Sequence, residues 1–600
     1  MKKNWKTESV FATALVAAVC AMVAVAREPN YDESKVAPYT LEDPLTFADG
    51  RKLKDASEWS ARRELEVPDV GGRCVVRVQP DGADKCVVSF RVPISDVQQI
   101  WTPDMIRPFV GRKWWLSKAS APQSSMPCIA YFNMAERNRF FFGAAALEWD
   151  CLLESKIDQE LGVYHVRLTV SAGEGRSLRP FDVTIDRRDV SWTQAVDDWR
   201  NSLPYARGSY PDGAWKPAYC TWYAAHAAIS EQWVERVAPI AADLGFGTFI
   251  LDDGWSYDEA KRVNPETIKT WYRDVGRWDS FSTAKFPDFK KHRERIRGLG
   301  MNYIVWVAPY FLGTRSDAFR RWGYDRRREV KVVEGNALTD IEDRPMMESV
   351  TEQLVRLLSD CNLDGLKIDF IDYIPPSVET PHGARTLEYV SDLMGRLRKV
   401  RPDGIFEFRQ SYATPMTANL ATQFRAEDVP FEWLDNLARM AQIRLTMGDG
   451  VPIHSDPIFW AESETMENVN RHFMAAMAGV PMLSMDLVGM SPEYRAVVRK
   501  WVRFYKEKVS QFHRHGKWRV FYRNGGLVGL VSVLEEKSFV IVNDPAGFET
   551  LLSACGEGEL TVCNVGFEPV TLADGTVVAP ADSYPASTMD GILTEDEEER

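Results

Sequence analysis

The chain has 600 residues, of which 45% are hydrophobic and 26% are charged, and its formal net charge is −13 at pH 7. This composition is that of a globular protein, and the length suggests about two to four domains. The acidic balance argues against nucleic acid and anionic membranes as partners. The chain has nine cysteines with no CxxC pair and no zinc-ligand spacing, which argues against a zinc-binding domain or a dense disulfide framework.

Residues 1–26 have the pattern of a secretory signal. Three lysines in the first six residues precede an apolar run over 11–25, which ends in the small-residue sequence Ala24-Val25-Ala26. The run is short for a membrane span, so we expect it to be removed and the protein to be exported to the periplasm or the cell exterior. Cys20 would allow a lipid anchor, but Val19 stands where a lipoprotein signal carries a small residue, so removal without lipidation is favoured.

Between residues 31 and 190, short runs of alternating polarity are separated by turn residues, as in "RCVVRVQPDGADKCVVSFRV". This pattern predicts an antiparallel β-sandwich over 31–190. Cys74 and Cys86 could face each other across a hairpin that turns at "PDGAD", although free buried cysteines fit the sequence equally well. A helical stretch, "WTQAVDDWRNSL", begins a linker over 191–215.

Residues 216–510 alternate apolar strand-like runs with helical stretches. In "ISEQWVERVAPIAADLG", for example, Ser230 can cap a helix and Gly245 can end it. Eight strands are predicted, at 217–223, 247–253, 302–308, 364–370, 404–409, 422–427, 451–455 and 481–486. Eight parallel strands with crossover helices predict a (β/α)₈ (TIM) barrel whose active site lies at the carboxyl ends of the strands. A doubly wound open sheet is the alternative, because strands alone do not show closure.

After a long helix around "EYRAVVRKWVRFYKEKVSQF", β character returns over 518–588. There "RVFYRNGGLVGLVSVLEEKSFVIVND" predicts paired antiparallel strands and a small C-terminal β-sandwich. Cys555 and Cys563 are a second possible local disulfide. The last residues, 589–600, form an acidic tail.

Charged and aromatic residues gather at the ends of the predicted barrel strands. Any single aspartate at such a position could instead cap the next helix, but five consecutive loops supply charges to one rim. Carboxylates facing tryptophans are typical of a sugar site, where glycosidic cleavage needs two acids in different protonation states. The residues are Trp222, Asp252, Asp253, Trp255, Trp306, Lys367, Asp369, Arg409, Arg425, Glu427, Asp428, His454, Asp456 and Asp486.

The fourth strand carries the pattern "LDGLKIDFIDY". Lys367 and Asp369 are two residues apart, so they point to the same face of a strand. An ammonium group next to Asp369 would keep that carboxylate ionised and nucleophilic. Asp372 falls in the following loop, where we expect it to act as a cap.

Six motifs of this region, "FILDDGW", "WDSFSTAKFPDF", "LGMNYIVWVAP", "DGLKIDF", "FRAED" and "HSD", resemble in order those of clan-D glycoside hydrolases of family 36, the α-galactosidases or melibiases. The resemblance covers roughly residues 216–490. It implies retaining hydrolysis of terminal α-D-galactosides, with Asp369 as nucleophile and Asp428 as acid/base. Two-carboxylate chemistry of this kind needs no metal or organic cofactor.

The resemblance also implies a set of substrate-binding residues, to which we add the other charged strand-end groups. The resulting set is Trp222, Asp252, Asp253, Trp255, Trp306, Lys367, Arg409, Arg425, His454 and Asp456. The expected partner is an oligosaccharide or glycoconjugate with a terminal α-galactose. The sequence leaves the oligomeric state open, and a homo-oligomer is possible because relatives with this architecture often assemble.

The sequence departs from the family pattern in several places. Ile368 and Tyr310 replace a usual tryptophan and a frequent acidic residue, and "FEFRQSY" replaces the cysteine- and glycine-rich loop after strand five. Arg409, Gln410 or Tyr412 is therefore expected to reshape the subsite at the sugar's second carbon, which leaves galactose and N-acetylgalactosamine both open.

Three other functions remain compatible with the sequence. The barrel could transfer galactose to another sugar, as raffinose-synthase relatives do. It could be a metal-dependent hydrolase that uses Asp252, Asp253, His454 and Asp456, although the chain has only eight histidines and no HxH or HExxH pattern. It could also bind carbohydrate without cleaving it.

Overall fold

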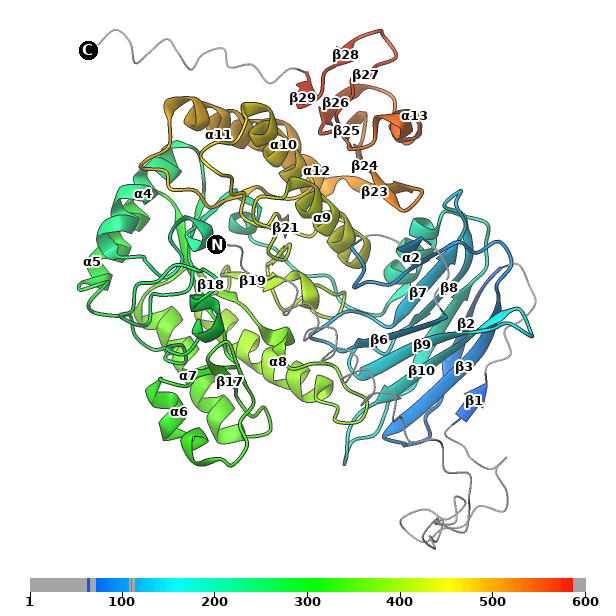
Figure 1. Ribbon diagram of the computed structural model, residues 1–600, viewed down its shortest axis with the longest axis horizontal. Coiled ribbons are helices and arrows are strands. Elements are labelled where there is room, and N and C mark those ends of the chain that lie inside the picture. The colour runs from blue at the N-terminus through cyan, green and yellow to red at the C-terminus, as the bar shows by residue number, and fades with distance from the viewer. Residues whose placement is uncertain (1–61, 65–71, 107–108, 111–113, 586–600) are drawn as a thin grey trace, which may run out of the picture. The chain divides into compact units, whose positions relative to one another are not determined.

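A computed structural model describes residues 62–64, 72–106, 109–110 and 114–585, all within one compact unit (Figure 1). The signal-like residues 1–26 and the acidic tail 589–600 lie outside the described residues. Among the residues described, no helix combines the length and apolar composition that a membrane crossing needs.

The N-terminal region consists of two packed β-sheets. One has the strand order β1 (Arg62–Glu64), β3 (Lys85–Pro93), β10 (Val163–Ser171), β9 (Asp150–Asp158), β6 (Trp115–Ser120). The other has the order β2 (Arg73–Val78), β11 (Phe181–Asp186), β8 (Asn138–Ala144), β7 (Cys128–Phe132), β4 (Gln99–Trp101), β5 (Phe109–Val110). Alternate residues such as Val88 and Phe90 of β3 are buried between the sheets. The predicted sandwich is confirmed.

Of the two alternatives for Cys74 and Cys86, the pairing across a hairpin is wrong and the free cysteines are confirmed. Cys74 lies on β2 and Cys86 on β3, and these strands belong to different sheets because the chain crosses the sandwich at "PDGAD". Both cysteines are free, as are Cys555 and Cys563.

The next region is a parallel eight-stranded barrel. Its sheet order is β21 (Ile453–His454), β20 (Gln423–Arg425), β19 (Ile405–Arg409), β18 (Gly365–Ile368), β14 (Asn302–Val307), β13 (Thr248–Leu251), β12 (Ala218–Cys220), β22 (Met482–Leu483). A parallel bridge between His454 and Val480 joins the chain just before β22 to β21. The predicted barrel is therefore confirmed, and the open doubly wound alternative is wrong. The eight predicted strands all form, each shorter than its apolar run.

Helices surround these strands (Figure 1). Ser230 caps α4 by accepting from the Trp233 N–H, and Gly245 follows the helix with a φ of 97°, which a glycine adopts readily. The helices are α3 (Trp222–Ala225), α4 (Glu231–Asp243), α5 (Phe289–Gly298), α6 (Asp317–Arg321), α7 (Arg344–Asp360), α8 (Gly383–Val400), α9 (Trp433–Met447), α10 (Met466–Ala476), α11 (Pro492–Phe504) and α12 (Ser510–His515).

Two β/α connections depart from the simple alternation. After β14 the chain forms a small sheet of β15 (Phe311–Gly313), β17 (Asn336–Leu338) and β16 (Val332–Val333) before α7. Between β19 and β20 the described chain has no α-helix, only a single 3₁₀ turn over Gln410–Tyr412. This is the loop "FEFRQSY" that departs from the family pattern.

The C-terminal region is a five-stranded sheet in the order β23 (Lys517–Arg523), β24 (Gly526–Leu534), β25 (Lys537–Val542), β26 (Glu559–Asn564), β29 (Asp582–Tyr584). The ribbon of β27 (Val570–Thr571) and β28 (Val577–Val578) and the helix α13 (Phe548–Leu552) pack against it. The predicted antiparallel pairing of the first strands is confirmed. The boundaries proposed for the separate domains stay predictions.

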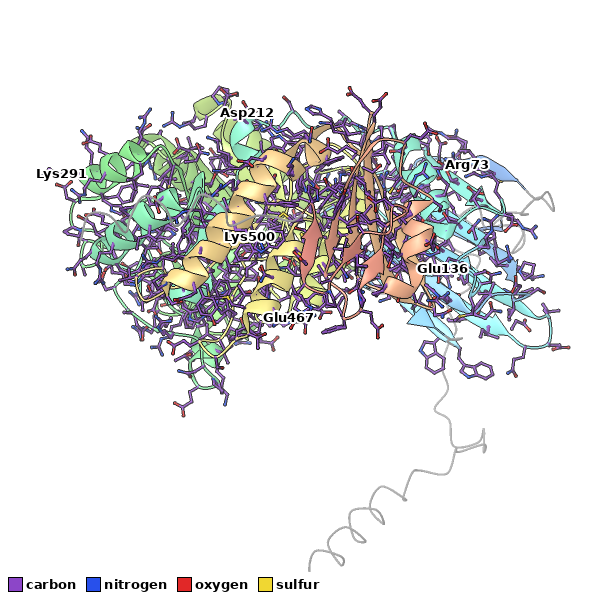
Figure 2. The ribbon with its side chains drawn as sticks, turned by 90° about the horizontal axis from the view of Figure 1, so that it is seen from above. Arg73, Glu136, Asp212, Lys291, Glu467 and Lys500 are labelled. Carbon is purple, nitrogen blue, oxygen red and sulfur yellow. The ribbon has the colours of Figure 1, made fainter. Side chains whose placement is uncertain are left out.

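Hydrogen bonds join the sandwich to its neighbours. The linker helix α2 (Trp192–Ser202) begins with Trp192, whose indole N–H donates to Glu136 at 2.9 Å. Glu136, labelled in Figure 2, lies on the side of the sandwich that faces the C-terminal strands. Asp150 of β9 accepts from the backbone N–H groups of Ser377 and Gly383 at 2.9 and 2.5 Å, which holds the N-terminus of α8. The sandwich thus supports the β18–α8 side of the barrel.

A substitution at Gly365 tests how closely the barrel strands pack. A Cβ there would lie 1.8 Å from the Ile405 carbonyl oxygen on the neighbouring strand, so we expect Gly365→Ala to lower the free energy of unfolding by about 2 kcal/mol or more. In the exposed helical position Gly395 a Cβ meets nothing within 4 Å, and Gly395→Ala should be neutral or stabilising by up to about 1 kcal/mol. Urea denaturation measures both, and equal effects would contradict the packing described for β18.

Candidate active site

A buried ion pair lies inside the barrel between strands β18 and β13. Lys367 Nζ donates to Asp252 Oδ2 at 2.6 Å, and both side chains are almost completely buried. The pair is supported by the Cys220 thiol, which lies 3.2 Å from the same oxygen. The expected pairing of Lys367 with Asp369 is therefore wrong: the ammonium reaches across to the second strand instead.

Asp369 follows directly after β18. Its Oδ2 accepts from the Trp306 indole N–H at 3.1 Å, and its Oδ1 accepts from the Phe370 backbone N–H at 3.0 Å. Phe370 has a φ of 58°, in the left-handed region that non-glycine residues rarely occupy, so the chain turns sharply here. Strained backbone often lies at functional sites, and this turn holds the carboxylate at the strand end.

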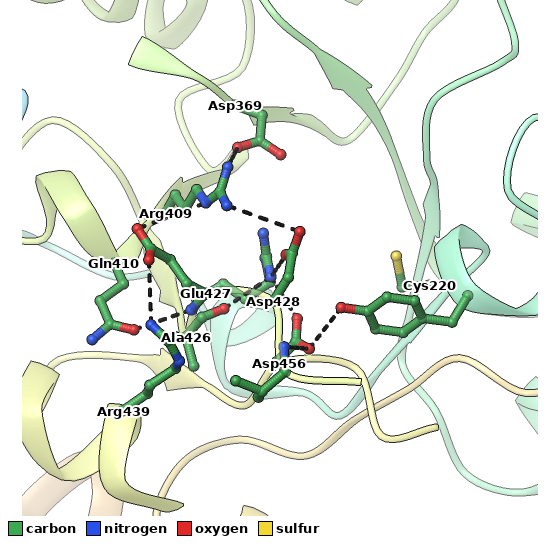
Figure 3. A network of polar contacts seen from close by, with 12 residues as sticks. Cys220, Asp369, Arg409, Gln410, Ala426, Glu427, Asp428, Arg439 and Asp456 are labelled. Carbon is green, nitrogen blue, oxygen red and sulfur yellow. Dashed lines mark hydrogen bonds and ion pairs between the residues drawn. The ribbon is translucent and has the colours of Figure 1, made fainter. Parts of the chain in front are cut away.

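The cation next to Asp369 is Arg409, which ends β19. Its Nη1 lies 3.5 Å from Asp369 Oδ1, and its Nη2 lies 3.9 Å from Asp428 Oδ2 (Figure 3). Its Nε lies 3.8 Å from Glu427 Oε1. One guanidinium group therefore contacts carboxylates from two different strand ends, and it lies between the two predicted catalytic residues.

Arg425 forms a second, deeper cluster. Its side chain is 2% exposed, and its Nη1 donates to Asp428 Oδ1 at 2.8 Å and to Asp456 Oδ1 at 2.6 Å. Asp456 Oδ2 also accepts from the Tyr223 hydroxyl and the Val429 N–H, so it fixes the loop that carries Asp428. Glu407, buried on the barrel interior, lies 3.5 Å from Arg425 Nε.

These charges shift the protonation of the carboxyl groups. Burial alone would raise the pKa of Asp428, but the guanidinium groups of Arg425 and Arg409 outweigh it and hold that pKa well below its usual range. Asp456 shares the single charge of Arg425 and is completely buried, and burial raises its pKa to about 7. The more exposed Asp428 is therefore the ionised member of the pair.

The second strand supplies a carboxylate with one free oxygen. Asp253 Oδ2 accepts from the Trp271 indole N–H at 2.8 Å and the Tyr257 hydroxyl at 3.0 Å, while its buried Oδ1 has no protein partner. Burial raises the pKa of Asp253 to about 6. This oxygen thus keeps an unused hydrogen-bond acceptor inside the barrel.

The predicted tryptophans take different places. Trp306 contacts Asp369, and the half-buried Trp222 packs edge-on against Trp271 with ring centroids 5.6 Å apart. Trp255 is fully buried and donates to the Trp306 carbonyl oxygen, so it supports the site from behind and does not fit the role of a pocket wall.

His454 does not join the cluster. It is fully buried, and its Nε2 lies 2.7 Å from the carbonyl oxygen of Ala214, in the segment that leads into the barrel. Its assignment to substrate binding is therefore not supported by its contacts.

Asp372 was expected to act as a cap, but it lies inside the 3₁₀ turn Ile371–Tyr373, whose N-cap position is held by Phe370. It lies near Arg409 and Glu427, its Oδ1 has no partner, and burial raises its pKa to about 6. Tyr412 is buried and donates to the Ile368 carbonyl oxygen, so it holds the β19–β20 loop against β18.

Sequence reasoning missed several residues of this cluster. Glu407 lies two residues before Arg409 on the same strand, and period-two spacing could have placed it inside the barrel. Trp271, Tyr257 and Tyr223 lie in loops or short helices with no pattern that marks them. Within the described chain, no group of three or more His, Cys, Asp or Glu side chains is arranged to hold a metal ion.

Among solved structures, the fold is similar to that of α-galactosidases, including members of glycoside hydrolase family 36. AgaA from Geobacillus stearothermophilus is 17% identical, with a TM-score of 0.58 over 74% of this chain and 66% of that chain. The α-galactosidase from Lactobacillus brevis is 15% identical, with a TM-score of 0.59 over 79% of this chain and 70% of that chain. The predicted resemblance and the barrel fold are confirmed.

Sequence comparison gives matches to parts of curated proteins. The bifunctional α-galactosidase/sucrose kinase AgaSK of Mediterraneibacter gnavus is 21% identical over 339 residues, 54% of this chain and 34% of that protein. An Escherichia coli α-galactosidase is 26% identical over 113 residues, 18% of this chain and 14% of that protein. The chain thus spans about a third or less of the length of these curated relatives. No family model matches it.

A substitution at Arg425 tests whether the stability of the buried carboxylate cluster depends on this one guanidinium group. Arg425→Met should lower the free energy of unfolding by about 3–5 kcal/mol, because it leaves Asp428 and Asp456 without their cation. A matched Arg77→Met variant loses an exposed pair with Asp182 and should change stability by less than about 1 kcal/mol. Chemical denaturation compares them; an Arg425→Met variant as stable as Arg77→Met would contradict the network.

Proposed function

We propose that the protein is a retaining exo-glycosidase that hydrolyses terminal α-D-galactosides, exported from the cell. The observation that carries the proposal is that Asp369 and Asp428, from the ends of strands four and six, both contact the guanidinium of Arg409 at the carboxyl side of a (β/α)₈ barrel. The similarity in fold to family 36 α-galactosidases supports it. Two of the related structures contain raffinose and stachyose, which supports an oligosaccharide substrate.

In this mechanism Asp369 attacks the anomeric carbon while the leaving oxygen takes a proton from Asp428. A galactosyl ester forms on Asp369, and a water that gives its proton to Asp428 then releases galactose. Such a reaction needs carboxyl groups about 5–5.5 Å apart. The Trp306 indole and the Phe370 N–H each hold one oxygen of Asp369, so the nucleophile enters the reaction already oriented.

An ionised Asp428 can act as the base when water releases the galactose. To act as the acid in the first step, Asp428 must instead carry a proton. The nearest cation that can leave is Arg409, whose contacts to Asp369 and Asp428 are long, at 3.5 and 3.9 Å. We propose that the entering sugar displaces this guanidinium and excludes water. Both changes raise the pKa of Asp428 and allow it to hold a proton.

Transfer of galactose to an acceptor sugar passes through the same galactosyl ester. The proposal also includes assembly into a homo-oligomer. It leaves both galactose and N-acetylgalactosamine as sugars that the site could accept.

Nitrophenyl α-glycosides test the proposed reaction. The wild-type enzyme should cleave the α-galactoside, and Asp369→Ala should lower kcat by at least about 10⁴-fold because no group replaces the nucleophile. The exposed Asp317 offers a matched control, and Asp317→Ala should keep full activity. Nitrophenol release measures all three. Failure of the wild type to cleave any α-glycoside of the panel would overturn the proposed function, and an active Asp369→Ala would overturn the nucleophile.

The pH profile tests the proposed role of Arg409. In Arg409→Met the pKa of Asp428 should rise, so the alkaline limb of kcat/KM should move to higher pH by about 1 unit. Arg409→Lys keeps the charge and should keep the wild-type limb. Identical profiles for the methionine and lysine variants would mean that the guanidinium does not control the acid.

A further inference from the structure

Asp456 is a completely buried carboxyl group that takes no part in the proposed reaction. It lies shortly after β21, and its side chain is 0% exposed, whereas the side chain of Asp428 is 42% exposed. Its Oδ2 accepts from the Tyr223 hydroxyl at 2.9 Å and from the Val429 backbone N–H at 2.8 Å. Its backbone N–H and carbonyl oxygen both bond to the side-chain amide of Asn436. The barrel thus holds this acid firmly in one place.

Asp456 and Asp428 lie close together at the strand ends and compete for one nitrogen of Arg425 (Figure 3). Nη1 of Arg425 donates to Asp456 Oδ1 at 2.6 Å, to Asp428 Oδ1 at 2.8 Å and to the Ala426 carbonyl oxygen at 2.8 Å. This nitrogen carries only two hydrogen atoms, so three acceptors share two donors. A stronger bond to Asp456 therefore means a weaker bond to Asp428.

The surroundings of Asp456 contain no second cation among the contacts of the described chain. The charged or titratable groups that face it are Arg425 from β20, Asp428 from the loop after β20 and Tyr223 from α3. The residue that faces it from α9 is Asn436, which is uncharged. The charge state of Asp456 is thus coupled to Asp428 through one guanidinium group.

The two carboxyl groups differ in how readily they ionise. Burial raises the pKa of Asp456 to about 7, whereas Arg425 and Arg409 hold the pKa of Asp428 well below its usual range. Because the groups are coupled, the pair keeps one proton up to about pH 7, and this proton lies mostly on Asp456. Whenever Asp456 is the ionised member, its negative charge raises the pKa of Asp428.

This coupling matters most once the substrate has displaced Arg409. Arg425 is buried and cannot leave with it, so Arg425 is then the cation that opposes a proton on Asp428. An ionised Asp456 offsets that cation. Asp428 can then carry a proton at a pH at which a carboxyl group alone beside Arg425 would have lost it.

We propose that Asp456 is a positioning residue for the acid step: it takes part of the charge of Arg425 away from Asp428, so that Asp428 can hold the proton that it gives to the leaving oxygen. The inference rests on the proposed function and deepens it, since it names the group that keeps the acid usable after Arg409 has left. No bond to carbon forms or breaks at Asp456.

Leaving groups of different basicity separate this role from a structural one. Methyl α-galactoside needs a proton on its leaving oxygen, whereas 2,4-dinitrophenyl α-galactoside needs almost none. In Asp456→Asn the whole charge of Arg425 acts on Asp428, which is then protonated less often. At about pH 8, kcat/KM for the methyl galactoside should fall about tenfold, while kcat/KM for the dinitrophenyl galactoside should stay within about twofold of wild type.

The pH profile gives a second readout of the same variant. Below about pH 5 the wild-type Asp456 is protonated and uncharged, so the two enzymes should converge there on the methyl galactoside. Tyr223→Phe removes a hydroxyl that stabilises the ionised Asp456 and should give a smaller loss in the same direction. If urea denaturation shows that Asp456→Asn does not fold, Tyr223→Phe decides the question.

Asn436→Ala is the matched structural control, because it removes both bonds to the Asp456 backbone without changing a charge. It should lower stability in urea and change kcat/KM for both galactosides by the same factor at every pH. If Asp456→Asn or Tyr223→Phe behaves like Asn436→Ala, Asp456 acts only on structure and the inference is overturned. A wild-type enzyme that cleaves neither galactoside would instead contradict the proposed function.

Discussion

The site depends on balancing many carboxylates with few buried cations. Lys367, Arg409 and Arg425 each reach across from one strand to another, and each supplies the cation for a buried carboxylate, Asp252, Asp369 and Asp456 respectively. A buried unpaired charge costs several kcal/mol, so these contacts fix which strand ends lie together. The same contacts set the protonation of the groups proposed to do the chemistry. Structure and reactivity therefore depend on one set of ion pairs.

This constraint explains why the loop after β19 matters. Arg409, the last residue of β19, lies between the two proposed catalytic carboxylates, and Gln410, the first residue of the loop, links Glu427 to Gln442. The absence of a helix in this connection leaves room for the sandwich to approach the barrel mouth. One departure in sequence thus changes both the charge beside the nucleophile and the contact between the sandwich and the barrel.

The barrel could be predicted from sequence because each buried strand is an apolar run and several of the helices, such as α4 with Ser230, begin at a capping side chain. The strand-end charges could be predicted as a group, since parallel strands end on one rim. Their partners could not. Lys367 and Asp369 lie two residues apart at the end of β18, but the ammonium pairs with Asp252, which follows β13, a contact set by barrel closure rather than by spacing along the chain. Trp255 and His454 are of residue types that are common in sugar-binding sites, yet their side chains are directed into the core.

Trapping of the covalent intermediate tests the central claim most directly. A slow fluorinated substrate such as 5-fluoro-α-galactosyl fluoride should leave a fluorogalactosyl group on the enzyme, and peptide mass spectrometry should locate it on Asp369. The Asp369→Ala variant, treated identically, should carry no label. A label on Asp428, Asp372 or any other carboxylate, or an active wild-type enzyme that never becomes labelled, would contradict the account.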